Sequence, residues 1–494
     1  MPRTQAFNLV DEAWVPIAGK GLASLREVFG TKDIGMLGGN PIQKIALLKF
    51  FQAIAQTART PKSDADWAAM GPKGLSEACL AYLDKWHESF WLYGEKPFLQ
   101  IPAIECAEKK SFGTQLLNIA TGNTTIIFDS QREKPLSDAE KALMVIVLMG
   151  FGFCRKTRNN KVVLTEGYTD KKITGNPGTS LGKLGYQHHF LIGSSLLETI
   201  WLNMLTENDL IPLKVFPKGV GVPPWEKMPQ GEDCETAKTL KKSLMGRLVP
   251  LSKFLLLAED GIHYSDGILH ADYKSGGFDP SVAIDTSGEE PKALWVDPEK
   301  QLWRHLPILL SFLDNSDGMD CLGIKTSIKR VRDHCQYFWL WAGGVSIHIS
   351  SFGEQKTQKK DDFLESTLQL ISDDMGQEWF SALACEMKKL DILSKILYAT
   401  VMRYYEDLGI RRSGKAKVAK AKEAEAASSL FWQKCDKWAQ HLVNACYMKT
   451  QMELRNKFAK YAQETYDSVC PRGTARQMEA WAANRPNTTK YLKQ

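Results

Sequence analysis

Helical spacing of apolar residues begins early in this chain, directly after Gly38-Gly39-Asn40-Pro41. The Asn40 side chain can accept a hydrogen bond from the free N–H groups of a first helical turn. Proline fits the first helical position, because the N–H that it lacks has no intrahelical partner there. Apolar side chains at positions 42, 45, 48 and 51 then fall near one face. The pattern predicts a helix that starts at Pro41 and buries one stripe.

Three further segments of the first half show local signals. Ser137 and Glu140 have the spacing of a capping box and precede an apolar run from 142 to 153, which predicts a buried helix. Residues 196–205 (LLETIWLNML) return to helical spacing. Residues 7–17 (FNLVDEAWVPI) predict a short strand and a turn.

From about Phe363 to the end, the pattern reads as helical. Amphipathic segments cover residues 375–408, 430–448, 452–469 and 474–483, and Pro471 and Gly473 separate the last two. Four such segments predict an antiparallel four-helix bundle. The polar stretch at 353–362 (GEQKTQKKDD) that precedes them is predicted to be a linker.

Residues 207–355 mix short β-like runs with turn signals at 266–267, 275–277 and 343–344. The chain therefore has an α+β pattern followed by a helical one. We expect an α+β fold with two domains: a large mixed N-terminal domain at 1–360 and a C-terminal four-helix bundle at 361–494.

Between residues 155 and 193 the composition becomes basic and rich in glycine. The cations are Arg155, Lys156, Arg158, Lys161, Lys171 and Lys172, and the glycines are Gly175, Gly178, Gly182 and Gly185. Long loops in a compact domain usually carry a function. A glycine backbone can approach a phosphate closely because no Cβ intervenes, and the cations supply counter-charge. The stretch is a candidate DNA contact, with an ordinary surface loop as the alternative.

The net charge is concentrated at one end of the chain. The 494 residues hold 63 Lys and Arg against 57 Asp and Glu, a formal charge of +6. Residues 365–494 hold 21 basic and 15 acidic side chains, so the first 364 residues are balanced at 42 of each. Such a local excess favours a polyanionic partner. Its densest part, 411–422, has six cations in twelve residues, and the alternative is a solvated connection between helices.

The remaining composition is that of a folded protein without membrane segments. Hydrophobic content is 44%, and the longest apolar run, at 142–153, is too short to cross a bilayer. The first residues lack the apolar core of a signal peptide. Ten cysteines contain no Cys-x-x-Cys pair, so neither a zinc ribbon nor a thioredoxin-type site is indicated. We expect a reduced, cytoplasmic protein with no membrane partner.

Catalytic patterns are weak. Of nine histidines only His188 and His189 are adjacent, and neighbours in sequence point in different directions, so we predict no metal site. Phosphate loops and the Gly-x-Ser-x-Gly elbow are absent. Asp285 with Glu290-Pro291-Lys292 loosely matches a nuclease core, although the proline would interrupt a strand. We expect no catalytic residue, no metal and no cofactor.

Three of these segments carry a family resemblance. FNLVDEAWVPI at 7–17, KPFLQIP at 96–102 and LLETIWLNML at 196–205 resemble the large subunit, CasA, of the type I-E CRISPR surveillance complex called Cascade. The glycine-rich loop, the Gly343-Gly344 turn and the terminal helices follow in the same order. The resemblance covers most of the chain in layout and is strongest in the first 210 residues.

The resemblance implies a binding subunit without catalytic activity, acting in antiviral defence. Such a subunit recognises the short protospacer-adjacent motif in double-stranded target DNA, promotes strand opening and recruits a separate helicase-nuclease. Its implied partners are crRNA, target DNA, that helicase-nuclease and the backbone, small and crRNA-end subunits of Cascade. Sequence specificity beyond the motif is left to guide pairing.

The resemblance also assigns nucleic-acid contacts. The loop that meets the crRNA end and the motif corresponds to Phe128, Asp129 and Ser130. The loop that enters the minor groove corresponds to 175–185, flanked by its cations. The lysine finger corresponds to Lys274. The wedge follows Gly343-Gly344; the residues there (VSIHIS) lack the usual Gln or Asn, which leaves His348 as the polar candidate. On general physical grounds, Lys415, Lys417 and Lys420 are candidates to hold a displaced strand.

Two other classes of function stay open from sequence. One is a metal-dependent nuclease built around Asp285 and 290–292. The other is a helical scaffold protein that binds no nucleic acid.

Overall fold

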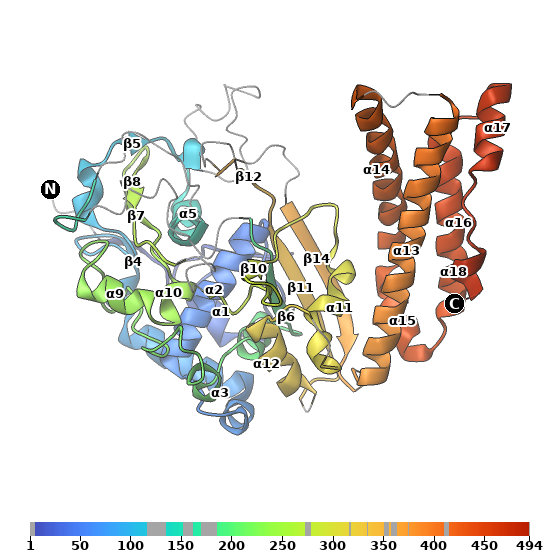
Figure 1. The fold of residues 1–494 in the computed structure, drawn as a ribbon. Helices are drawn as coiled ribbons and strands as arrows, with labels where there is room; N and C mark the ends of the chain where they lie inside the picture. Colours follow the sequence, from blue (N-terminus) through green and yellow to red (C-terminus); the bar gives the residue numbers. More distant parts are fainter. Residues whose placement is uncertain are drawn as a thin grey trace. The chain divides into compact units, whose positions relative to one another are not determined.

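The structure is a computed structural model that describes residues 5–115, 135–151, 162–168, 185–271, 278–315, 318–332, 334–349, 355–356, 363–373, 375–409 and 414–493. The chain divides into two compact units (Figure 1). The first unit comprises Met1–Pro298 and Met319–Thr367, and the second comprises Glu299–Gly318 and Leu368–Gln494. None of the described helices combines the length and hydropathy needed to cross a membrane.

The first unit contains two long helices among many short elements. Its described helices are α1 (Leu25–Gly30), α2 (Pro41–Ala58), α3 (Asp64–Lys85), α5 (Asp138–Phe151), α7 (Leu196–Leu202), α8 (Glu207–Leu210), α9 (Glu235–Lys241), α10 (Met245–Leu248) and α12 (Leu322–Val331), with 3-10 helices η1 (His87–Phe90), η2 (Pro102–Cys106) and η3 (Phe112–Gln115).

The described strands are β1 (Ala6–Asn8), β2 (Val15–Ile17), β3 (Gly21–Ala23), β4 (Trp91–Tyr93), β5 (Lys109–Lys110), β6 (His188–Ile192), β7 (Lys253–Leu257), β8 (Ile262–Asp266), β9 (Ile284–Asp285), β10 (Lys292–Ala293), β11 (Tyr337–Val345), β12 (His348–Ile349), β13 (Gln355–Lys356) and β14 (Phe363–Ile371). They form two three-stranded sheets, ordered β14-β11-β6 and β5-β8-β7, and four two-stranded ones. In the first sheet β11 runs antiparallel to β6.

Helix α2 lies in the core of the first unit. The Asn40 side chain accepts a hydrogen bond from the Gln43 N–H at 3.0 Å, and the Gln43 side chain accepts one from the Asn40 N–H at 2.9 Å. The predicted cap and the start at Pro41 are confirmed. The helix buries 14 of its 18 residues rather than one stripe. Its Phe50 ring meets the rings of Trp14, Phe98 and Trp225 at 5.5–6.1 Å, so one aromatic cluster joins α2 to three other segments.

Two interpretations near residue 360 are wrong. Residues 363–371 form strand β14 rather than helix; their buried leucines at 364, 368 and 370 have spacings of four and two, and a spacing of four fits both periods. The stretch at 353–362 is not linker throughout, because Gln355 and Lys356 form β13 and pair with β12.

The second unit is helical apart from the end of strand β14, residues 368–371. Its described elements are η5 (Leu302–Arg304), α11 (Leu306–Leu309), η6 (Ser311–Leu313), α13 (Gln377–Asp407), α14 (Gly414–Asp436), α15 (Ala439–Met448), α16 (Gln451–Val469), α17 (Ala475–Ala483) and α18 (Thr489–Lys493). Figure 1 shows α13, α14 and α16 side by side, and these three helices pack on one another. The α+β class with C-terminal helices is confirmed. The helix predicted at 430–448 is in fact two helices, which meet at Lys437-Trp438.

Candidate nucleic-acid interface

Most residues predicted to contact nucleic acid lie outside the described part of the chain. These are Phe128, Asp129, Ser130, Arg155, Lys156, Lys171, Lys172, Gly175, Gly178, Gly182 and Lys274. For His348 in β12, and for Lys415 and Lys417 in α14, the structure places the backbone only. What the structure does give is the set of described residues on either side of these segments.

The described ends of three such segments lie side by side in the first unit. Tyr186, which directly follows the glycine segment, forms an antiparallel bridge with Trp295. His188 forms another with Val282, a few residues beyond the predicted lysine finger. The ring of Phe151, which ends α5 before the basic segment, lies 5.8 Å from the His188 ring.

Gly343 and Gly344 were predicted to form a turn before the wedge, but they lie inside strand β11, and they reach the same place. Gly343 is paired in register with His188. A Cβ built on Gly344 would lie 2.8 Å from the Tyr186 carbonyl oxygen and 2.5 Å from Val296 Cγ2, so the backbones are in close contact. We call residues Phe151, Gly185–His188, Val282 and Gly343–Ile347 the contact frame. Four segments far apart in the sequence therefore begin or end at one place.

Gly185 itself is part of the protein interior. A Cβ at this position would lie 2.6 Å from two ring atoms of Trp295 and 2.8 Å from Ile347 Cγ1. The Val296 N–H donates to the Gly185 carbonyl at 2.8 Å. Gly185 is buried, so the expectation that it enters a DNA groove is wrong for this residue; it is glycine because a tryptophan ring packs against its backbone.

A buried carboxylate holds residues 162–168, which lie between the cations at 155–161 and those at 171–172. Glu232 is fully buried and accepts hydrogen bonds from the N–H groups of Leu164 at 3.1 Å and of Thr165 at 2.9 Å. The Asp233 N–H donates to the Thr165 hydroxyl at 3.1 Å. Sequence inspection missed this contact, because a single glutamate near a helix start carries no signal of a partner 67 residues away.

A network of buried, hydrogen-bonded polar side chains contacts the frame at His188. Lys49 of α2 donates to both carboxylate oxygens of Asp279 at 2.8 and 2.9 Å. The Ser281 N–H and hydroxyl donate to Asp279 at 3.0 and 2.8 Å, and the same hydroxyl lies 2.8 Å from His188 Nδ1. Burial opposes the ionisation of Asp279, yet Lys49 and these hydrogen bonds hold its pKa below the ordinary value. An ion pair thus fixes the start of β6.

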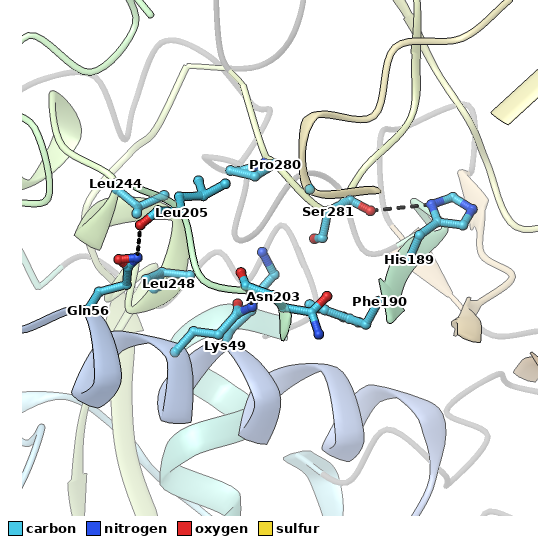
Figure 2. Close-up of a pocket in the computed structure, with 12 residues that line it drawn as sticks. Lys49, Gln56, His189, Phe190, Asn203, Leu205, Leu244, Leu248, Pro280 and Ser281 are labelled. Atoms are coloured by element: carbon cyan, nitrogen blue, oxygen red, sulfur yellow. Dashed lines mark hydrogen bonds between the residues drawn. The ribbon is translucent and has the colours of Figure 1, made fainter. Parts of the chain in front are cut away.

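The pocket beside this network is too small for a nucleotide. Figure 2 shows Lys49 and Gln56 on one side of the pocket and Ser281 with His189 on the other. Its volume is about 30 Å³, enough for a water-sized molecule only. Gln56 donates to the Leu205 carbonyl at 2.7 Å. The pocket is therefore a feature of the core and not a nucleotide site.

The two adjacent histidines serve this core. His188 Nδ1 lies 2.8 Å from the Ser281 hydroxyl, and His189 Nδ1 lies 3.3 Å from the Ser281 carbonyl oxygen. Burial lowers the pKa of His188 to about 3, so this ring is neutral at physiological pH. Among the described residues, no three His, Cys, Asp or Glu side chains gather where they could hold a metal ion.

The residues of the alternative nuclease site form a small exposed hairpin. Asp285 of β9 faces Lys292 of β10 in register. The Ser287 hydroxyl and N–H donate to the Asp285 carboxylate at 2.6 and 2.9 Å, and these hydrogen bonds lower its pKa. The carboxylate is thus held by its own turn, an arrangement common in tight turns of any protein.

The burial of Lys420 contradicts its prediction as a contact for a displaced strand. Its side chain is only 5% exposed. In α14, position 420 shares a face with Ala424, Ala427 and Phe431, which are all fully buried, because these positions repeat at the helical period. Lys420 is therefore not an exposed nucleic-acid contact, whereas Lys415 and Lys417 stay predictions.

The solved structures compared below share this fold and come from one class, the CRISPR-associated proteins. The CasA of Thermus thermophilus superposes with a TM-score of 0.74 at 16% identity, over 99% of this chain and 100% of that one. The Cse1 of Thermobifida fusca gives 0.74 at 16% identity, over 99% and 98%. A chain of a structure titled "CRISPR RNA-guided surveillance complex" gives 0.71 at 16% identity, over 98% and 99%.

Sequence comparison identifies the family within this class. The model of CRISPR-associated protein Cse1 matches residues 8–469. The chain therefore belongs to the Cse1 family, and the resemblance seen in the three segments is confirmed. The CasA/Cse1 protein of Thermus thermophilus is 27% identical over 342 residues, and the match spans 63% of this chain and 61% of that relative's length.

Proposed function

We propose that this chain is the non-catalytic large subunit of a cytoplasmic, crRNA-guided surveillance complex. In this proposal it recognises the protospacer-adjacent motif in duplex DNA, promotes strand opening and recruits a helicase-nuclease. Motif recognition is assigned to the mixed N-terminal domain, residues 1–360. Its partners are crRNA, target DNA and the backbone, small and crRNA-end subunits.

The contact frame is the observation that carries this proposal. The described residues that flank segments rich in glycine and in Lys or Arg lie where four distant parts of the chain meet, beside the Lys49–Asp279 ion pair. A packed frame flanked in sequence by glycine-rich stretches suits a protein that senses groove shape. Minor-groove acceptors distinguish little beyond A·T from G·C, so backbone and a few cations suffice. A side chain that enters the stack costs a few kcal/mol per step, and guide pairing then balances the lost DNA pairing.

The test is duplex binding by the reconstituted complex. The chain is assembled with its crRNA-bearing partners, and labelled duplexes that differ only in the nucleotides flanking the guide-matched sequence are titrated. We expect the affinity of the complex for a duplex to depend on these flanking nucleotides. Gly178→Asp with Gly182→Asp is expected to weaken binding about 10-fold or more, because two anions are placed among phosphate-facing residues, while crRNA retention stays unchanged.

Gly35→Asp with Gly376→Asp is the matched control, because it also adds two anions, at positions where a Cβ meets no atom within 4 Å. Equal affinity for all flanks would contradict motif recognition. An unchanged dissociation constant for the double variant would remove residues 175–185 from the interface.

A further inference from the structure

A wide groove lies beside the end of helix α2 in the first unit. Its lining residues come from residues 56–60 around the end of α2, from α8 and from the run 211–221 that follows α8. Its volume is about 870 Å³, within the range of about 300–1,000 Å³ typical of ligand pockets. We call it the α2–α8 groove. None of the described residues that line it belongs to the contact frame.

One wall of the groove is a series of turns at residues 211–221, and hydrogen bonds hold these turns in place. The Phe216 N–H donates to the Leu213 carbonyl at 3.0 Å, which closes one turn. The Leu244 N–H donates to the Gly219 carbonyl at 2.9 Å, which ties the wall to the segment before α10. The groove is therefore formed before a ligand arrives, and binding does not have to order the wall.

Apolar side chains lie both inside the groove and outside it. Leu210 and Phe216 line it with buried side chains. At its edge the Ile211 side chain is 78% exposed, and Val222, which directly follows the last lining residue, is 48% exposed. A small molecule that fills only the groove would leave these two side chains in water, whereas a protein partner would cover them. Exposed apolar side chains around a groove therefore favour a protein as the occupant.

The charge beside the groove is positive. Lys214, Lys218 and Lys242 are exposed, and among the described residues none of their ammonium groups has a carboxylate partner. The Lys218 N–H donates to the Lys242 carbonyl at 3.1 Å, so the backbones that carry these two lysines are in contact. Glu207 is the only acidic side chain among the described lining residues. Such a surface attracts a partner that carries carboxylates.

We infer that the α2–α8 groove binds a short segment of a partner protein in which aliphatic side chains alternate with carboxylates. The aliphatic side chains would be buried against Leu210 and Ile211, while the carboxylates would meet the exposed lysines. A nucleic-acid strand fits less well. Phe216 is the only aromatic lining residue and is 3% exposed, so bases find no ring to stack on. This binding goes beyond the proposed function, because it requires neither crRNA nor target DNA.

The experiment measures the fluorescence anisotropy of labelled peptides of about 12 residues as the full chain is added. The first peptide alternates leucine with glutamate, the second has lysine in place of glutamate, and the third has serine in place of leucine. The leucine–glutamate peptide is expected to bind at least about 10-fold more tightly than either of the others, because only it offers both kinds of contact. Equal binding of all three peptides, or binding of none, would contradict the inference.

Two variants then place the peptide in the groove. Ile211→Ser is expected to weaken binding about 10-fold, because an aliphatic contact is lost from an exposed position that does not support the fold. Lys214→Glu with Lys218→Glu is expected to weaken it about 10-fold at low salt, since carboxylates then face carboxylates. Lys20→Glu with Lys32→Glu is the matched control, because it makes the same charge change at exposed positions that do not line the groove.

The inference is wrong if the control pair weakens peptide binding as much as the groove pair, or if neither groove variant changes the dissociation constant. A labelled oligo-dT is titrated in parallel. Tighter binding of this strand than of the leucine–glutamate peptide, lost in the groove lysine pair and kept in the control, would assign the groove to nucleic acid and overturn the inference.

Discussion

At the scale of single residues, two buried histidines make stability depend on pH. Burial lowers the pKa of both His188 and His270 from 6.5 to about 3. Between these values the unfolded chain binds more protons than the folded one, so stability is lost as the pH falls below about 6.5.

Each ring is expected to remove about 1.4 kcal/mol of unfolding free energy per pH unit in that window. His270→Gln keeps an N–H that can donate to the Pro250 carbonyl, which His270 Nε2 meets at 2.7 Å. Urea unfolding at pH 7, 6 and 5 is expected to show a shallower pH dependence for this variant than for the wild type. The same dependence for both proteins would contradict a neutral, buried His270.

The residues that carry the family resemblance turn out to be structural. Gln100 is 3% exposed, donates to the Leu92 carbonyl and accepts from the Leu257 N–H, each at 2.8 Å. Trp201 stacks on Trp67 at 3.9 Å. Such residues identify the fold because buried packing tolerates few alternatives. They say nothing of the site, which is why the fold could be predicted from sequence and Glu232 and Trp295 were missed.

At the scale of elements, local signals decided which helices could be predicted. The caps at Asn40 and Ser137 gave correct helix starts, because a capping motif consists of two or three neighbouring side chains. Helix α3 was not predicted, since Gly71 and Pro72 interrupt it and Gly71 has a φ of 57°. Strand β14 was misread as helix, because the four-residue spacing of Leu364 and Leu368 fits both periods and the pairing with β11 is not visible in the sequence.

Glu232 is expected to hold residues 162–168 to the first unit. Glu232→Ala leaves the Leu164 and Thr165 N–H groups without their acceptor, at a cost of about 1–3 kcal/mol each when buried. Opening of this segment is then expected to be at least about 10-fold more frequent. Limited trypsin digestion, read by mass spectrometry, is expected to show faster cleavage at Lys161 and Lys171 and an unchanged pattern elsewhere.

Glu235→Ala is the control for this variant, because Glu235 is exposed three residues further along. Equal cleavage rates for wild type and Glu232→Ala would show that the carboxylate does not anchor the segment. Faster cleavage over the whole chain would mean that the variant has unfolded the unit instead.

At the scale of the whole molecule, the net charge differs between the part of the chain that contains the contact frame and the helical C-terminal part. The first 364 residues carry no net charge and include the contact frame, whereas residues 365–494 carry the whole excess of +6. Shape recognition of a duplex needs few charges, while non-specific attraction to a polyanion grows with each one. The sequence revealed this division directly, because net charge needs no fold to be counted. It did not reveal which lysines are exposed, as the buried Lys420 shows.

Lys415 and Lys417 provide the test of this division. If both meet phosphates when the assembled complex binds its duplex, Lys415→Glu with Lys417→Glu is expected to reduce the slope of log affinity against log salt by about 1.8. Lys20→Glu with Lys32→Glu makes the same change at exposed positions of the balanced part and is expected to leave the slope nearly unchanged. Equal shifts for the two pairs would mean that only total charge matters. No shift for either pair would mean that the basic start of α14 is solvated surface, and the polyanion would then have to be held by other cations of residues 365–494.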